Sequence, residues 1–289
     1  MPSPSPENLF RPIHDAHAIL EEMVFFEFSP PLEEAMPGLI ALKDELKADF
    51  PTHEVLNTIK VHFTHQDQKP PELSSPELNK AAGIRLIKLD VDGTINQNIL
   101  IGQESVALSC LKYSVWSDIW PEQKNHISKI FAKIVGTSSF LTGIGMRWVD
   151  QFIYDGDLSA YEASALLKTS SSYLHNSAFR SGSRWHCHTG WFDAGTYPGR
   201  EVLNQVNLDA GLANVAGEMR TAVTVAHTQI LRVTQLPDEL ATFMPHKGTG
   251  LDTLSGLMDA LHDGNKRILD DLLIDSMSER IGLRSRQTA

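Results

Sequence analysis

Alternating and aromatic-rich stretches predict strands along most of the chain. Residues 21–28 (EEMVFFEF) are aromatic and β-branched, and Pro30 ends this strand because proline cannot donate a hydrogen bond to a neighbour. Ile84, Leu86 and Lys88 alternate with their neighbours, and Asp92-Gly93 is typical of a hairpin turn within 83–102. We predict further strands over 55–64, 105–116, 140–154, 184–192, 201–208 and 218–233.

Apolar residues at helical spacing predict four helices. Over 36–49, Leu39, Leu42 and Leu46 form one stripe. A second helix over 121–134 would place Pro121 in its first turn, where proline is tolerated. We expect a short helix over 158–168 and a long helix over 251–277.

Runs of strands separated by helices indicate an α+β fold with largely antiparallel sheets. We expect two similar strand-rich halves, each backed by helices, with a long helix at the C-terminus. The expected division is a flexible tail over 1–16, an N-terminal half over 17–168 and a C-terminal half over 169–289, or one continuous domain.

Composition narrows the class of protein. The chain has 289 residues, and no apolar run approaches the roughly 20 residues that span a bilayer. Its two cysteines, Cys110 and Cys187, suggest no disulfide framework, so we expect a cytoplasmic protein. Its 36 acidic and 25 basic residues disfavour nucleic acid as a partner, and we expect neither a membrane partner nor a cofactor.

The segment Asp90-Val91-Asp92-Gly93-Thr94 resembles the first motif of haloacid-dehalogenase-type phosphatases. In that family the first Asp is a covalent nucleophile and the second is an acid/base. The resemblance implies Mg²⁺ chemistry at Asp90 and Asp92. The family requires a loop and helix after the motif, whereas an alternating strand follows here, so we favour a hairpin turn.

The segment 185–191 offers a second candidate site. His186 and His188 point to one side of a strand, because side chains alternate with period two. We consider His227 as a third ligand of a metal site, since a catalytic zinc needs three protein ligands. The favoured interpretation is a polar histidine pair beside Trp185 and Trp191 in a binding surface.

Several segments together resemble a sporadically distributed family of bacterial proteins of about this length, for which no activity is established. The resemblance covers most of the chain and implies no catalytic residue. The patchy occurrence of the family associates it with defence or mobile-element genes. The matching segments are 17–19, 25–31, 50–51, 113–116, 144–152 (IGMRWVDQF), 185–191 and 202–209 (VLNQVNLD).

From the residues we expect a non-catalytic interaction protein with a protein partner, because no catalytic motif fits its required context. The binding candidates are Trp185, His186, His188, Trp191 and His227. The alternatives are a metal-dependent enzyme that uses the three histidines and an Asp90/Asp92 phosphatase.

Overall fold

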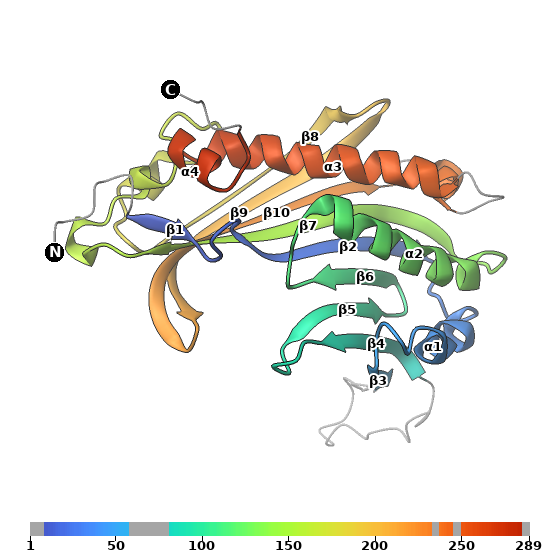
Figure 1. Ribbon diagram of the computed structural model, residues 1–289. Helices are drawn as coiled ribbons and strands as arrows, with labels where there is room; N and C mark the ends of the chain where they lie inside the picture. Colours follow the sequence, from blue (N-terminus) through green and yellow to red (C-terminus); the bar gives the residue numbers. More distant parts are fainter. Residues whose placement is uncertain (1–8, 58–80, 233–236, 245–249, 285–289) are drawn as a thin grey trace, which may run out of the picture.

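Ten strands form one antiparallel sheet in the order β3-β4-β5-β6-β2-β7-β10-β9-β8, and β1 pairs with β7 beside this path (Figure 1). The computed structural model describes residues 9–57, 81–232, 237–244 and 250–284. The strands are β1 (Phe10–Pro12), β2 (Ile19–Ser29), β3 (Thr52–Asn57), β4 (Ala81–Leu89), β5 (Ile95–Ile101), β6 (Ser105–Cys110), β7 (Phe140–Tyr154), β8 (Trp185–Tyr197), β9 (Arg200–Val215) and β10 (Glu218–Arg232).

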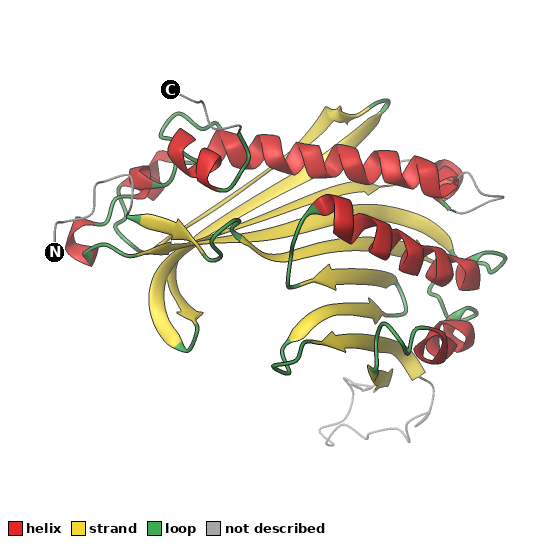
Figure 2. Cartoon of the chain, in the orientation of Figure 1, coloured by secondary structure: helices red, strands yellow, loops and turns green. Residues whose placement is uncertain are grey.

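The three longest helices lie on one face of the sheet, which we call the helix side, and the opposite face is the open side (Figure 2). These helices are α1 (Met36–Glu45), α2 (Trp116–Ile134) and α3 (Gly250–Leu272); the short α4 (Asp275–Arg280) follows α3. The α+β class with a largely antiparallel sheet is confirmed. Among the described helices, none combines the length and apolar character needed to cross a membrane.

The two halves of the sheet repeat one topology. In each half a long first strand pairs with the last strand before a helix: β2 pairs with β6, which leads to α2, and β7 pairs with β10, which leads to α3. The two first strands pair with each other at the centre of the sheet. The topological repeat therefore divides before β7, while the domain division expected at 168/169 stays a prediction.

Inward-facing residues explain why the helices cover this face. Val24 and Phe26 of β2 are fully buried, and Phe26 meets Phe131 of α2 edge-on at 4.8 Å between ring centroids. A second apolar cluster lies beneath the C-terminal part of α3 and includes Val225 and Leu269. On the open side, Gly145 faces Phe25, and a Cβ there would come within 2.3 Å of the Phe25 ring, so this close contact requires glycine.

The largest departure from the expected elements lies around Trp116. The strand predicted over 105–116 ends at Cys110, and α2 begins at Trp116, so Pro121 lies inside the helix and not in its first turn. A proline in a helix interior removes one backbone hydrogen bond. The buried side chains of Ile119 and Trp120 keep the additional turn in place.

The chain between β7 and β8 is also different from expectation. Two short 3₁₀ turns, Leu158–Ala160 and Ala163–Ala165, replace the helix predicted over 158–168. Leu167 instead pairs with Leu273 as an isolated bridge, which separates α3 from α4. Tertiary pairing thus divides the single long helix that periodicity predicted.

Several strands have bounds that differ from the predicted ones. The described part of the expected tail contains β1, which pairs with β7, while residues 1–8 lie outside the described residues. Strand β3 ends at Asn57, and the rest of the strand predicted over 55–64 also lies outside them. Strands β8 and β9 extend past their predicted ends.

Candidate functional site

The structure separates the histidines that the sequence grouped. His186 and His188 of β8 lie on the open side and are exposed. His188 is opposite Asn207 of β9, which is opposite Ala226 of β10, so the next residue, His227, points to the helix side. Because successive side chains alternate between faces, one metal ion cannot contact all three imidazoles.

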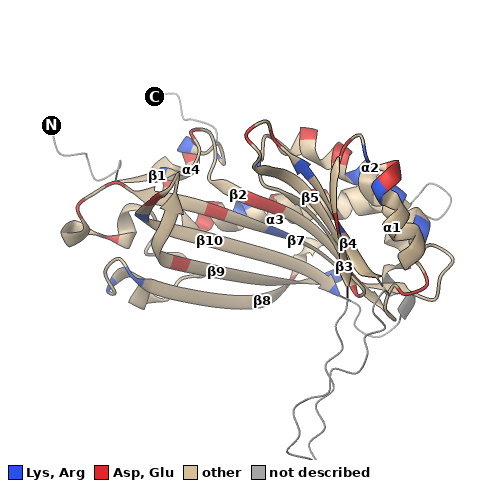
Figure 3. Ribbon diagram, turned by 90° about the horizontal axis from the view of Figure 1, so that it is seen from below, with Lys and Arg blue, Asp and Glu red and all other residues tan. Residues whose placement is uncertain are grey.

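On the open side, His186 pairs with Asp209 of β9 at 3.3 Å between Nδ1 and Oδ1. Both side chains are more than half exposed, so this contact is screened by water. Within the described ranges, no group of three or more His, Cys, Asp or Glu side chains is placed to hold a metal. The strands β8 to β10 carry few charged residues, whereas charged side chains are frequent on the helices (Figure 3).

Trp185 and Trp191 point to the helix side, away from His186 and His188. Trp185 is 8% exposed, and Trp191 stacks on Tyr173 at 4.6 Å between ring centroids. The two tryptophans therefore pack in the second apolar cluster and do not form one surface with the histidines.

The segment at Asp90 is a hairpin turn, as its alternating neighbours predicted. Strand β5 pairs antiparallel with β4, and Gly93 has a φ of +80° in the turn. Asp92 accepts hydrogen bonds from the backbone and hydroxyl of Thr94, and Lys112 pairs with both aspartates. The loop and helix that a phosphatase motif requires are replaced by β5.

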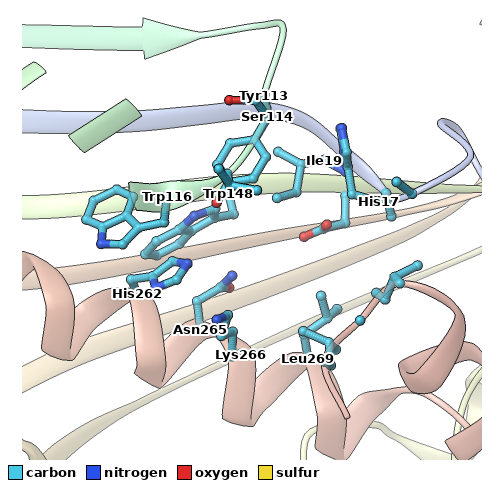
Figure 4. A pocket seen from close by; sticks show the side chains of 17 residues that line it. His17, Ile19, Tyr113, Ser114, Trp116, Trp148, His262, Asn265, Lys266 and Leu269 are labelled. Carbon is cyan, nitrogen blue, oxygen red and sulfur yellow. The ribbon is translucent and has the colours of Figure 1, made fainter. Parts of the chain in front are cut away.

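A cavity of about 280 Å³ lies between the centre of the sheet and α3 (Figure 4). Its walls come from the chain before β2, the connection between β6 and α2, strand β7, helix α3 and the chain after α4. The side chains used below are His17, Tyr113, Trp116, Trp148, Asp150, His262 and Lys266.

An aromatic ladder, which we define as Trp120, Trp116, His262, Trp148 and His227, forms one end of this cavity and continues beyond it. Trp116 stacks on Trp120 at 5.4 Å and on His262 at 4.8 Å between ring centroids. Trp148 lies 6.5 Å from His262 and 6.2 Å from His227. Rings from two helices and two strands are thereby held as one wall.

Hydrogen bonds fix the ladder at Trp116 and at His227. Trp116 Nε1 donates to Asp259 Oδ1 at 2.8 Å. His227 Nδ1 lies 2.8 Å from Asn265 Oδ1 and its Nε2 lies 3.1 Å from Asn204 Oδ1. Gly264 allows α3 to approach β10 this closely, since a Cβ there would come within 2.7 Å of a buried Gln229 side-chain atom.

Two buried polar groups at the cavity have no partner. Asp150 is 2% exposed, and no described residue donates to its Oδ1. Trp148 is fully buried, and no acceptor among the same residues reaches its Nε1. Both residues line the cavity and lie two positions apart on the helix side of β7. Buried polar groups are normally satisfied, so these two need an explanation.

Burial sets the charge state of the ionisable groups here. Loss of hydration raises the pKa of Asp150 to about 7, and burial lowers the pKa of His262 to about 4. His17 also has a lowered pKa, because of burial and then the neighbouring His14. Burial raises the pKa of Tyr113, as do the charges of Glu22, Cys110 and Asp150. At neutral pH the two histidines and the tyrosine are therefore largely uncharged.

The sequence contained a signal for this cavity that we did not use. The inward positions of β7 are Ile144, Met146, Trp148, Asp150 and Phe152, so one carboxyl interrupts an apolar series. A charge at such a position is rarely buried unless it is paired or functional. His17, Tyr113 and Lys266 had no such signal, because only folding brings their segments together.

Comparison with known proteins adds no family. No protein-family model matches the chain, and no curated protein matches it at a significant level. The cavity is therefore the feature from which a function can be inferred.

Proposed function

We propose that this protein is a non-catalytic binding protein that holds a small organic molecule in the cavity between β7 and α3. The observation that carries the proposal is the unsatisfied pair Asp150 and Trp148, an acceptor and a donor on one wall of a cavity. Leaving a buried polar group unpaired costs about 1–3 kcal/mol. A ligand that pairs with both groups would recover that cost.

The size and lining of the cavity support a small ligand. Binding pockets are lined mainly by apolar and aromatic side chains with a few placed polar groups, and most measure roughly 300–1,000 Å³. The cavity, at about 280 Å³, lies just below that range, so it fits a small ligand. Trp116 and Trp148 supply aromatic walls, and Asp150 supplies a polar group for orientation.

For the cellular setting, composition suggests the cytosol, while the resemblance implies a bacterial protein linked to defence genes; both are hypotheses. Cys110 and Cys187 are both free and buried, which supports a reducing compartment. The protein partner expected from the sequence is a separate hypothesis. For it, the open side of β8 offers Phe192, 68% exposed, in line with His186 and His188.

Ligand-observed NMR with a library of ring-containing fragments tests the cavity. Ser114 is an exposed residue that lines the cavity, so Ser114→Phe should obstruct it without disturbing the core. Ser117→Phe is the matched control, because Ser117 is exposed nearby on α2 and is not part of the lining.

We expect fragments that bind the wild type and Ser117→Phe but lose their signal with Ser114→Phe. A library without any wild-type ligand would contradict the proposal. Ligands that bind Ser114→Phe equally well would place binding elsewhere on the protein.

A further inference from the structure

The charges around the cavity are unevenly distributed. Asp150 is fully buried inside it, and a second buried acid, Glu22, lies on the neighbouring strand β2 and influences Tyr113. Asp259, an exposed residue of α3 that does not line the cavity, accepts a hydrogen bond from Trp116 Nε1. Among the described residues, Lys266 is the one Lys or Arg in the cavity lining, and it is exposed, so water screens its charge.

The histidines of the lining do not balance these acids. Burial lowers the pKa of His262 to about 4, and the pKa of His17 is lowered as well, so neither imidazole carries a positive charge at neutral pH. Burial is also the one identified cause of the raised pKa of Asp150, since no described group compensates its charge.

We propose, on the basis of the proposed function, that the molecule held in this cavity is an organic cation, an aromatic ring that carries an alkylammonium or amidinium group whose N–H donates to Asp150. A charged N–H donor supplies both the hydrogen bond and the countercharge that Asp150 lacks. Such charge-assisted bonds are about twice as strong as neutral ones. The aromatic ring of the ligand packs beside Trp148, which lines the cavity.

The aromatic ladder favours the same class of ligand. Tryptophan rings attract cations through their electron-rich faces, and the attraction increases when water is excluded. Trp148 is fully buried and stands two residues from Asp150 on the same side of β7. An anionic ligand would meet the Asp150 carboxyl without a buried cation to pair with it.

Three probes of nearly equal shape separate charge from shape: benzamidine is a cation, benzamide is neutral and benzoate is an anion. Isothermal titration calorimetry at pH 8, where Asp150 is ionised, measures the affinity of the wild type for each probe. We expect benzamidine to bind at least about tenfold more tightly than benzamide and benzoate not to bind, because a neutral or anionic probe leaves the buried Asp150 carboxylate without a countercharge.

Variants then assign the effect to one carboxyl. Asp150→Asn should weaken benzamidine binding by about 30-fold or more. Glu22→Gln is the matched control, because Glu22 is an equally buried acid on the helix side that does not line the cavity. It should leave benzamidine affinity within about threefold, and a thermal melt of each variant confirms folding.

The outcomes separate this inference from the proposed function. If benzamide or benzoate bound as tightly as benzamidine, the inference that the ligand is a cation would be wrong, but the proposed binding cavity would stand. Unchanged benzamidine affinity in folded Asp150→Asn would also overturn it. If no ring compound binds the wild type, both proposals fail. The wild-type charge series decides the question even if Asp150→Asn does not fold.

Discussion

Each half of the sheet buries one acid on its first strand, and the hydrogen bonding of the two acids differs. On β2, Glu22 is fully buried, and Gln123 Nε2 of α2 donates to its Oε2 at 2.7 Å. On β7, Asp150 is 2% exposed, no described donor reaches its Oδ1, and the residue lines the cavity. One oxygen of Glu22 is thus satisfied by the chain itself, whereas Glu22 Oε1 and Asp150 Oδ1 have no described partner, and of the two acids Asp150 lines the cavity.

The pKa values of both acids are raised because burial removes hydration, to about 8 for Glu22 and to about 7 for Asp150. An acid with a raised pKa in the folded state binds more protons when folded. The free energy of unfolding therefore falls as pH rises from the unfolded value toward the folded value, and then stays level. For Asp150 this window runs from about 4 to about 7, and for Glu22 from about 4.5 to about 8.

The largest effect should come from Trp148, which stands opposite Glu22 in the sheet and also lines the cavity. Trp148→Ala removes a fully buried ring that contacts His227 and His262, so the free energy of unfolding should fall by about 3–5 kcal/mol. Urea denaturation measures this. Val91→Ala, at a fully exposed turn position, should change it by less than about 0.5 kcal/mol. A comparably small loss for Trp148→Ala would mean that the ladder does not support the fold.

An intermediate effect is expected at Asp150. Asp150→Asn removes the cost of ionising a buried carboxyl, so the variant should be more stable than the wild type at pH 8 by about 1–3 kcal/mol. At pH 4 the two proteins should be nearly equal, because the folded wild type is then protonated at Asp150. Denaturation curves between pH 4 and pH 8 measure the difference.

Glu22→Gln sharpens this comparison. Its free energy of unfolding should also increase relative to that of the wild type as pH rises, but this increase should continue to about pH 8. Saturating benzamidine should reduce the advantage of Asp150→Asn and leave that of Glu22→Gln. If Asp150→Asn follows the wild-type pH curve, the carboxyl is compensated in solution and the two acids do not differ as described.

The smallest effect is expected on the open side. His186→Ala breaks an exposed contact with Asp209 and should change the free energy of unfolding at pH 7 by less than about 0.5 kcal/mol. His227→Gln provides the contrast, because it disrupts a buried site bonded to Asn204 and Asn265. A loss above about 1 kcal/mol in His186→Ala would show that this histidine is fixed by more than Asp209.

Much of the fold could be predicted because local rules decide it. The strands predicted over 21–28, from its aromatic and β-branched residues, and over 140–154 match β2 and β7 within two residues of their ends, and Asp92-Gly93 correctly predicted the hairpin between β4 and β5. Prediction failed where distant contacts override local preference. Pro121 lies inside α2 because Ile119 and Trp120 are buried, and the Leu167–Leu273 bridge interrupts the last helix.

The site was harder to predict than the fold. His186 and His188 were correctly placed on one side of a strand, but strand order determines which face His227 shares, and a single sequence does not contain that order. The acid at position 150 could have been noticed in its apolar series. Its lack of a partner could not, because that depends on the positions of Tyr113 and α3.

By itself, the sequence determined the α+β class, the hairpin at Asp92-Gly93 and most strand positions, since these follow from side-chain period and turn chemistry over a few residues. The tertiary structure alone decided that β2 and β7 meet at the centre, that the histidines separate, and that Asp150 faces a cavity beside α3. Each of these features depends on packing between segments that are far apart in the sequence, as His17 and Lys266 are, at 249 positions from each other. No local pattern of residues contains information on such packing.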